Sequence, residues 1–169
     1  MKLTAGRGDS LMSRFKNSTK KLAETPPEIV KTVSYDPLNP SQRSERMKLI
    51  RSKNTKVEMK VRRLIHGMGY RYRLHAKALP GSPDLVFPTR KKVIFVHGCF
   101  WHQHDNCRHY RMPRSNLEFW LPRLESNRRR DTKTYSQLDH SGWGYLVVWE
   151  CELKNLDAVA SKIQTFLEA

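Results

Sequence analysis

The segment at residues 97–107, HGCFWHQHDNC, constrains the possible folds of this chain more than any other part of it. It holds three histidines, two of the three cysteines and an adjacent Phe–Trp pair. It directly follows an apolar run, KVIFV at residues 92–96, which is typical of a buried strand. Because a buried strand is a rigid support, metal ligands and aromatic rings at its end indicate a chemical site at that end of a sheet.

The chain is also strongly basic. Its 169 residues include 32 Lys and Arg against 16 Asp and Glu, a formal net charge of +16. Such a charge predicts a salt-dependent attraction to a polyanion, and DNA, RNA and an anionic membrane surface all satisfy it. Clustered metal ligands on so basic a chain favour nucleic acid, and phosphate chemistry in particular.

Composition limits where the chain acts. No apolar run approaches the roughly 20 residues that span a bilayer, and no long apolar segment near the start resembles a secretory signal. The three cysteines are an odd number that suits a reduced cytosol, where clustered Cys and His more often bind metal than form disulfides. We therefore expect a cytoplasmic protein without membrane contacts.

The chain divides into an arm and a domain. Residues 1–40 are basic with little periodicity, which predicts a largely disordered arm with a weak helix at residues 10–21. An organelle transit peptide is the alternative interpretation of this arm. Residues 41–169 are long enough for a single domain with one hydrophobic core.

Helix-capping patterns mark where several helices begin. Asn and Pro at residues 39–40 are typical of a cap and a first helical residue, and residues 55–58 form a capping box ahead of a second helix that stops at Gly69. Residues 115–118 suggest another capping box, starting a helix that we expect to bend near Pro122. A basic helical run follows and ends before residue 142.

Alternating or continuous apolar residues mark the strands. The predicted strands are residues 70–74, 84–87, 92–97 and 145–151, and a final amphipathic helix covers residues 156–167. The fourth strand is too apolar for a sheet edge. The chain is therefore predicted to form an α/β sheet with helices packed on it.

A Cys/His set predicts a structural zinc site. Cys99, His104 and Cys107, joined by Cys151 after the fourth strand, supply the four thiolate and imidazole donors that suit tetrahedral zinc. His102 and His109 compete for the histidine position. The alternative is that Cys151 is simply a buried cysteine and the histidines are surface residues.

An acidic residue and two histidines predict a hydrolytic site. Asp84 begins an apolar strand, where its carboxylate is placed to hold magnesium, a cation that prefers oxygen ligands. His97 and His102 are candidates for proton transfer. The alternatives are that Asp84 caps its own turn and that Glu58 serves only the capping box.

Aromatic and basic residues predict a DNA surface. Phe100 and Trp101 lie in a polar loop, where wedging between bases explains them better than core packing. Trp120 fits an apolar helix stripe and is expected in the core on that pattern alone. Further candidates for phosphate contacts are Arg128, Arg129 and Arg130, although charge runs are often only solvated faces.

Several motifs in one order resemble those of a known family. The motifs RSERMKLIRSKNTKVE, RYRLHAKALPGSPDLVF, VIFVHGCFWHQH, NLEFWLPRLESNRRRD and GWGYLVVWEC are similar to those of the very short patch repair (Vsr) DNA mismatch endonucleases of bacteria. The resemblance implies a restriction-endonuclease-like (PD-(D/E)XK-type) mixed central sheet flanked by helices. It also implies an enzyme that nicks double-stranded DNA 5′ to the thymine of a T·G mismatch, which arises from deamination of 5-methylcytosine.

The resemblance also implies roles for individual residues. It assigns magnesium to Asp84 and the backbone carbonyl of Val96, hydrolysis to His97 and His102 with support from Glu58, DNA insertion to Phe100, Trp101 and Trp120, and structural zinc to Cys99, His104, Cys107 and Cys151. The insertion role replaces the core interpretation of Trp120. The predicted third strand is apolar and ends in His97, so hydrolysis would rely on histidine.

The expected partner is double-stranded DNA with a T·G mismatch, bound by a monomer in the bacterial cytoplasm and hence on the nucleoid. Mismatch-repair and DNA polymerase proteins are further candidate partners. Two other functions fit parts of the sequence. One is a strand-nicking nuclease of a restriction or phage-defence system, and the other is a non-catalytic, zinc-stabilised DNA-binding module.

Overall fold

The computed structural model describes residues 39–49, 53–74 and 76–169 of the chain. The predicted N-terminal arm, with its expected helix at residues 10–21, lies outside the described residues except for its last two positions. None of the described helices is both long and apolar enough to cross a membrane.

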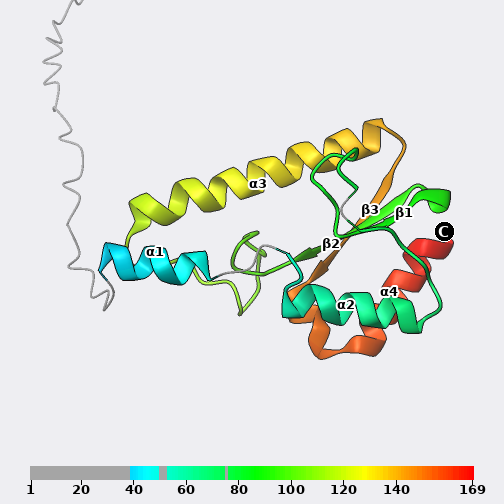
Figure 1. Cartoon of the computed structure of the whole chain (residues 1–169), viewed down its shortest axis with the longest axis horizontal. Helices are drawn as coiled ribbons and strands as arrows, with labels where there is room; N and C mark the ends of the chain where they lie inside the picture. Colours follow the sequence, from blue (N-terminus) through cyan, green and yellow to red (C-terminus); the bar gives the residue numbers. More distant parts are fainter. Residues whose placement is uncertain (1–38, 50–52, 75) are drawn as a thin grey trace, which may run out of the picture. The chain divides into compact units, whose positions relative to one another are not determined.

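The described elements begin with two helices, after which strands alternate with helices or 3-10 turns. In chain order they are α1 (Pro40–Lys48), α2 (Lys56–Gly67), β1 (Leu85–Phe87), the 3-10 turn η1 (Pro88–Arg90), β2 (Lys92–His97), α3 (Leu117–His140), β3 (Gly144–Trp149), the 3-10 turn η2 (Glu150–Lys154) and α4 (Leu156–Glu168). The strands form one sheet in the order β1-β2-β3, in which β2 runs antiparallel to β1 and parallel to β3 (Figure 1). The predicted mixed α/β sheet flanked by helices is confirmed.

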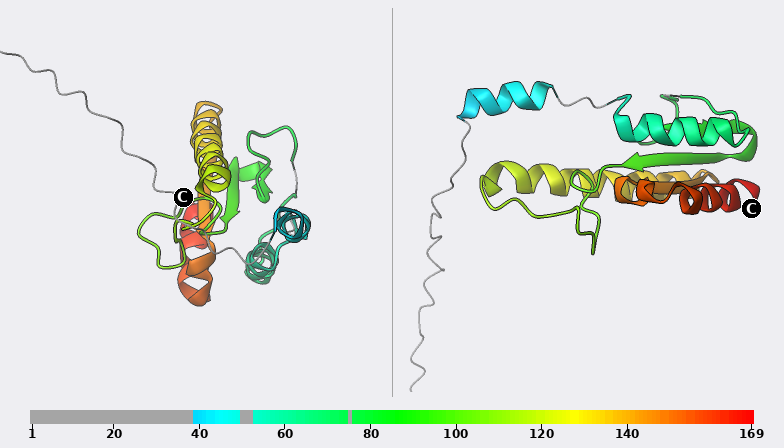
Figure 2. Two further views of the ribbon diagram at one scale, coloured as in Figure 1. Left: turned by 90° about the vertical axis from the view of Figure 1, so that its left-hand side faces the viewer. Right: turned by 90° about the horizontal axis from the view of Figure 1, so that it is seen from below.

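Helices cover both faces of the sheet. The helix α3 lies on one face, and α2 and α4 lie together on the other (Figures 1 and 2). Successive side chains of a strand point to opposite faces, so Phe95 of β2 packs with Leu138 of α3, whereas Ile94 packs with Ile65 of α2 and Ile163 of α4. Side chains of β2 and of α3 therefore meet on the same face of the sheet.

The first two helices begin at the predicted caps. Asn39 accepts a hydrogen bond from the Gln42 N–H, with Pro40 as the first helical residue of α1. Thr55 accepts from the Glu58 N–H, and the Glu58 carboxylate accepts from the Thr55 N–H in return. Both capping predictions are confirmed, because they depend only on residues within one turn.

The strand predicted at residues 70–74 is wrong. In the described part of the chain, Arg73 makes an isolated bridge with Val86, through two backbone hydrogen bonds of 2.8 and 2.9 Å. Tyr72 packs against the core and donates its hydroxyl hydrogen bond to the Arg62 carbonyl at 3.1 Å. The alternation of tyrosines reflects packing onto α2 and β1, and the described sheet has three strands instead of four.

The capping box predicted at residues 115–118 is also wrong. The helix α3 begins at Leu117, and the residue before it, Asn116, lies in the left-handed region with φ 51°. Both predicted helical segments belong to this single 24-residue helix, which contains Pro122. Proline removes only one backbone hydrogen bond from a long helix, so tertiary packing can compensate for it.

The expectation that the last strand is internal is wrong as well. Among the described residues, β3 forms an edge of the sheet, beside β2. Its apolar character comes from packing on both faces, where Leu146 and Val148 face α2 and α4, and Tyr145 and Val147 face α3. Cys151 lies in η2, after the strand.

The turn before β1 is pinned against α3, which makes a stability prediction possible. Gly81 has φ +73°, and a Cβ there would lie 2.3 Å from Thr134 Cγ2. Gly142 has φ +69°, with nothing within 4 Å of the corresponding position. We expect Gly142→Ala to cost roughly 1–2 kcal/mol for the left-handed backbone alone, and Gly81→Ala to cost roughly 1–3 kcal/mol more for the clash.

Urea denaturation of both variants measures the difference in the free energy of unfolding. Equal losses of stability would show that the contact between Gly81 and Thr134 does not constrain the turn.

Candidate active site and Cys/His cluster

The carboxylate of Asp84 is held at the junction of β1 and β2. The Val96 N–H donates a hydrogen bond of 2.7 Å to Asp84 Oδ2. Leu85, the first residue of β1, pairs with Ile94, so Asp84 lies just before β1 and reaches toward the end of β2. The pKa of Asp84 is raised to about 6, chiefly by burial; the Val96 hydrogen bond opposes this rise, and the negative charge of Glu58 contributes to it.

Two histidines and an aspartate meet beside this carboxylate. The rings of His97 and His102 are stacked with centroids 3.6 Å apart, and His102 Nδ1 lies 2.6 Å from Asp131 Oδ2. The three side chains come from the end of β2, the following loop and α3. Burial and the neighbouring His102 lower the pKa of His97 to about 3, so its ring is neutral near pH 7.

Sequence reasoning missed Asp131. It stands at the end of an arginine run, which was interpreted as a basic helical surface. Leu124, Asp131 and Leu138 are spaced by seven residues, which places them on one face of α3, and both leucines are buried. Asp131 could therefore have been identified as a candidate from its position as an acidic residue on the apolar stripe of a basic helix.

These side chains share one cavity of about 590 Å³. Its lining includes four residues singled out in the sequence, Asp84, Val96, His97 and His102, together with Asp131 and the cations Lys53, Lys77 and Arg130. A second cavity, of about 570 Å³, also borders Val96, His102 and Arg130 and extends to Trp101 and Asn127. A carboxylate, imidazoles and cations in one cavity can bind a phosphate ester and move protons beside it.

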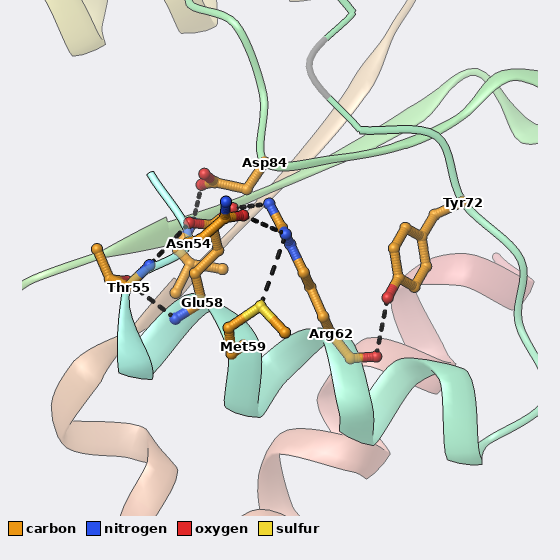
Figure 3. A network of polar contacts seen from close by, with 8 residues as sticks. Asn54, Thr55, Glu58, Met59, Arg62, Tyr72 and Asp84 are labelled. Atoms are coloured by element: carbon orange, nitrogen blue, oxygen red, sulfur yellow. Dashed lines mark hydrogen bonds and ion pairs between the residues drawn. The ribbon is translucent and has the colours of Figure 1, made fainter. Parts of the chain in front are cut away.

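Glu58 lies in a polar network below Asp84 and does not line either of these two cavities (Figure 3). It is buried, forms an ion pair with Arg62, and accepts a hydrogen bond from the Thr55 N–H. Arg62 Nη1 also donates to Asn54 Oδ1 at 2.8 Å. Glu58 therefore acts on Asp84 through its charge and through the position of α2.

The predicted Cys/His set forms a cluster. One ligand atom each of Cys99, His104, Cys107 and Cys151 lies within 4.8 Å of all the others. His104 Nδ1 lies 3.4 Å from Cys151 Sγ, and its ring stacks on Trp149 at 4.0 Å. Among the described residues, the competing candidate His102 belongs to the His97–Asp131 group instead.

The donors of this cluster suit a soft metal ion. Burial raises the pKa of the Cys99 thiol, so the thiolate needs a compensating positive charge. Three sulfur donors and one imidazole within reach of a common centre supply that arrangement for a bound cation. The cluster joins the loop after β2 to η2, two segments far apart in the sequence.

The three predicted DNA-inserting aromatic residues form a separate group. Phe100 lies 5.2 Å from Trp101 and 5.3 Å from Trp120, between ring centroids, in edge-to-face arrangements. All three are half-buried, so Trp120 is not part of the buried core. The group lies beside the second cavity, which Trp101 lines.

The three consecutive arginines of α3 differ in their surroundings. All are exposed, and Arg128 and Arg129 face Asp105 and Glu125, at 3.5 and 2.9 Å. Arg130 lines both cavities and donates to Asn127 Oδ1 at 2.6 Å. Arg130 is therefore the one of the three that the fold places at the candidate site.

Comparisons with known proteins identify related DNA endonucleases. The sequence profile of the DNA mismatch endonuclease Vsr family matches residues 35–108. The chain is 49% identical over 133 residues to the type II nicking enzyme V.XorIIP of Xanthomonas oryzae pv. oryzae, covering 79% of this chain and 97% of the relative. It is 37% identical over 123 residues to the DNA mismatch endonuclease Vsr of Escherichia coli, covering 73% of this chain and 78% of the relative.

Among solved structures, the catalytic domain of the homing endonuclease I-Bth0305I aligns with a TM-score of 0.47 and 21% identity, over 67% of this chain and 94% of that domain. This backbone likeness is weak beside the sequence relationships. With more than a third of the aligned residues identical over most of both chains, this protein belongs to the DNA mismatch endonuclease Vsr family and is a DNA endonuclease.

Proposed function

We propose that the protein nicks one strand of double-stranded DNA 5′ to the thymine of a T·G mismatch and so initiates very short patch repair. The observation that carries this proposal is the shared cavity of Asp84, His97, His102 and Asp131, bordered by the cavity that Trp101 lines. The E. coli relative is named a mismatch endonuclease, and the resemblance of the sequence motifs to the Vsr family implies DNA insertion for the aromatic group. We also infer a restriction-endonuclease-like fold from that resemblance.

Magnesium is the proposed cofactor of this cavity. The Asp84 carboxylate and the backbone carbonyl of Val96 are oxygen donors of the kind that this hard cation prefers. When bound, magnesium would stabilise the negative charge that develops on the phosphate and the leaving oxygen. The half-buried position of Asp84 fits this role, because a cation offsets the unfavourable burial of its charge.

His102 is the proposed general base. Its Nδ1 faces Asp131 at 2.6 Å, which orients the ring and fixes the tautomer in which Nε2 can accept a proton from water. Neutral His97 stacks on this ring and holds it in place, and Tyr135 Oη lies 3.5 Å from His97 Nδ1. Asp131 is therefore a positioning residue for His102.

The aromatic group supports recognition of a mismatch. Insertion of Phe100, Trp101 and Trp120 between bases would cost a few kcal/mol of unstacking, and less at a mismatch than at a matched pair. Arg130, Lys53 and Lys77 supply positive charge for the phosphates around the cavity. Discrimination would then depend partly on how easily the duplex deforms.

One observation favours a second candidate function, a nicking nuclease that does not require a mismatch. The relative with 49% identity is named a type II nicking enzyme, so a nicking nuclease of a restriction or defence system would use the same site on another target. The two functions differ in whether the mismatch is required.

The first test uses end-labelled duplexes that are identical except for one T·G mismatch or its matched C·G pair. We expect a magnesium-dependent nick 5′ to the mismatched thymine, and no nick in EDTA or in the matched duplex. Equal cutting of both duplexes would favour the restriction or defence function. Binding without cutting of either duplex in several sequence contexts would refute nicking at a T·G mismatch.

The role of Asp84 predicts a separation of cleavage from binding. We expect Asp84→Asn to reduce nicking by about a thousandfold or more, because it removes the charge that holds the cation, whereas mismatch binding measured by gel shift persists. Asp139→Asn, an exposed change on α3, is the matched control and should nick normally. Normal nicking by the Asp84 variant would refute this assignment.

Zinc is the proposed occupant of the Cys/His cluster. We expect about one zinc per chain in the purified protein, from the four-donor set, and loss of that zinc together with a lower Tm in Cys151→Ser. His109→Ala is the control, since among the described residues His109 is outside the cluster, and should retain zinc. Metal analysis and thermal denaturation measure both effects. Zinc lost from the His109 variant but kept by Cys151→Ser would contradict the ligand assignment.

A further inference from the structure

Arg62 is a buried cation whose contacts lie on two different segments. Its side chain is 7% exposed, and the network around it is drawn in Figure 3. One terminal nitrogen, Nη2, pairs with Glu58 of the same helix, and the other, Nη1, donates to Asn54 Oδ1 in the turn before α2. Burying a guanidinium is costly unless its donors are paired, so both contacts matter for keeping it there.

The turn that Arg62 holds has an unusual backbone. Asn54 has φ 54°, in the left-handed region that glycine adopts readily and Asn more easily than most other residues. The Glu58 carboxylate holds the next residue, because it accepts a hydrogen bond from the Thr55 N–H at 3.4 Å. The turn at residues 53–55 is thus fastened to α2 from two sides.

The residue that this turn presents is Lys53. Its side chain is exposed and lines the cavity that contains Asp84, His97 and His102. An ammonium group at the edge of a cavity that takes a phosphodiester is placed for contact with a DNA phosphate. Its position depends on Asn54, the next residue, and therefore on the hydrogen bond from Arg62.

We propose that Arg62 and Asn54 form a latch that positions Lys53 to bind a DNA phosphate beside the bond that is cut. The inference rests on the proposed function, since it takes the 590 Å³ cavity to be the place of the scissile phosphate. Lys53 is the residue that binds DNA, and Arg62 acts through Asn54 as a positioning residue. The competing role for Arg62 is that of a counter-ion for Glu58 alone.

Substitutions can separate these two roles. Arg62→Lys keeps a positive charge beside Glu58. Its single ammonium nitrogen cannot replace the two guanidinium nitrogens that bind Glu58 and Asn54 separately. Asn54→Gly removes the acceptor while keeping a residue that adopts positive φ without strain. Lys53→Met removes the proposed phosphate contact directly. Arg63→Met, an exposed change at the next position of α2, is the matched control.

The experiment measures nicking of a T·G duplex by the full-length variants, and their DNA affinity in EDTA at several salt concentrations. We expect Lys53→Met to lower kcat/KM about tenfold and to reduce the slope of log affinity against log salt by about one. Arg62→Lys and Asn54→Gly should give similar losses, and neither should lower kcat/KM further when combined with Lys53→Met. Arg63→Met should retain the parent kcat/KM.

Several results would overturn the latch. Parent kcat/KM and salt slope in Lys53→Met would exclude the phosphate contact. Losses in Arg62→Lys and Asn54→Gly that multiply with that of Lys53→Met would leave Arg62 as a counter-ion of Glu58. If Arg62→Lys does not fold, as judged by its Tm, Asn54→Gly alone decides the question. The salt slopes are independent of cleavage. Failure of the proposed function, seen as equal cutting of the matched and T·G duplexes or as no cutting of either, is therefore distinguishable from failure of the latch.

Discussion

The pairing of β1 with β2 is the constraint on which the candidate site depends. Its register sets Asp84 against the end of β2, where the Val96 N–H holds the carboxylate at 2.7 Å and His97 follows immediately. Because Phe95 and His97 point to the same face of β2, the histidine meets α3, and Asp131 of that helix meets His102. A shift of the register by one residue would place His97 on the opposite face of the sheet and separate it from His102 and Asp131.

Charge is distributed unevenly over this molecule, and the site uses that imbalance. The chain has a formal net charge of +16, yet Asp84 and Asp131 line the cavity and Glu58 lies close to it. The negative charge of Glu58 raises the pKa of Asp84, and the positive charge of the buried Arg62 lowers it. The same guanidinium fastens the turn that carries Lys53, so one ion pair serves both the local electrostatics and the geometry of the cavity.

The long loop after β2 is rich in polar residues, and the Cys/His cluster brings donors from this loop and from η2 together. It ties Cys99, His104 and Cys107 to Cys151 in η2, close to the stacked pair of His104 and Trp149. With its base fixed, the loop presents His102 to α3 and Phe100 and Trp101 to Trp120. The proposed general base and two of the aromatic residues therefore lie on one loop.

Signals within a few residues of one another sufficed to predict the caps at Asn39 and Thr55, the bounds of β2 and the three members of the Cys/His cluster that follow it, whereas Cys151 was added from residue type alone. Local signals did not predict that Arg73 pairs with Val86 through a single bridge or that β3 lies at the edge of the described sheet. They also did not predict the contact of Asp131 with His102 or the burial of Arg62. The sequence by itself determined which side chains could perform hydrolysis, since residue type and helix or strand periodicity are local properties. Only the tertiary structure decided which of them meet, because contacts between β2, α2 and α3 depend on how whole faces pack together.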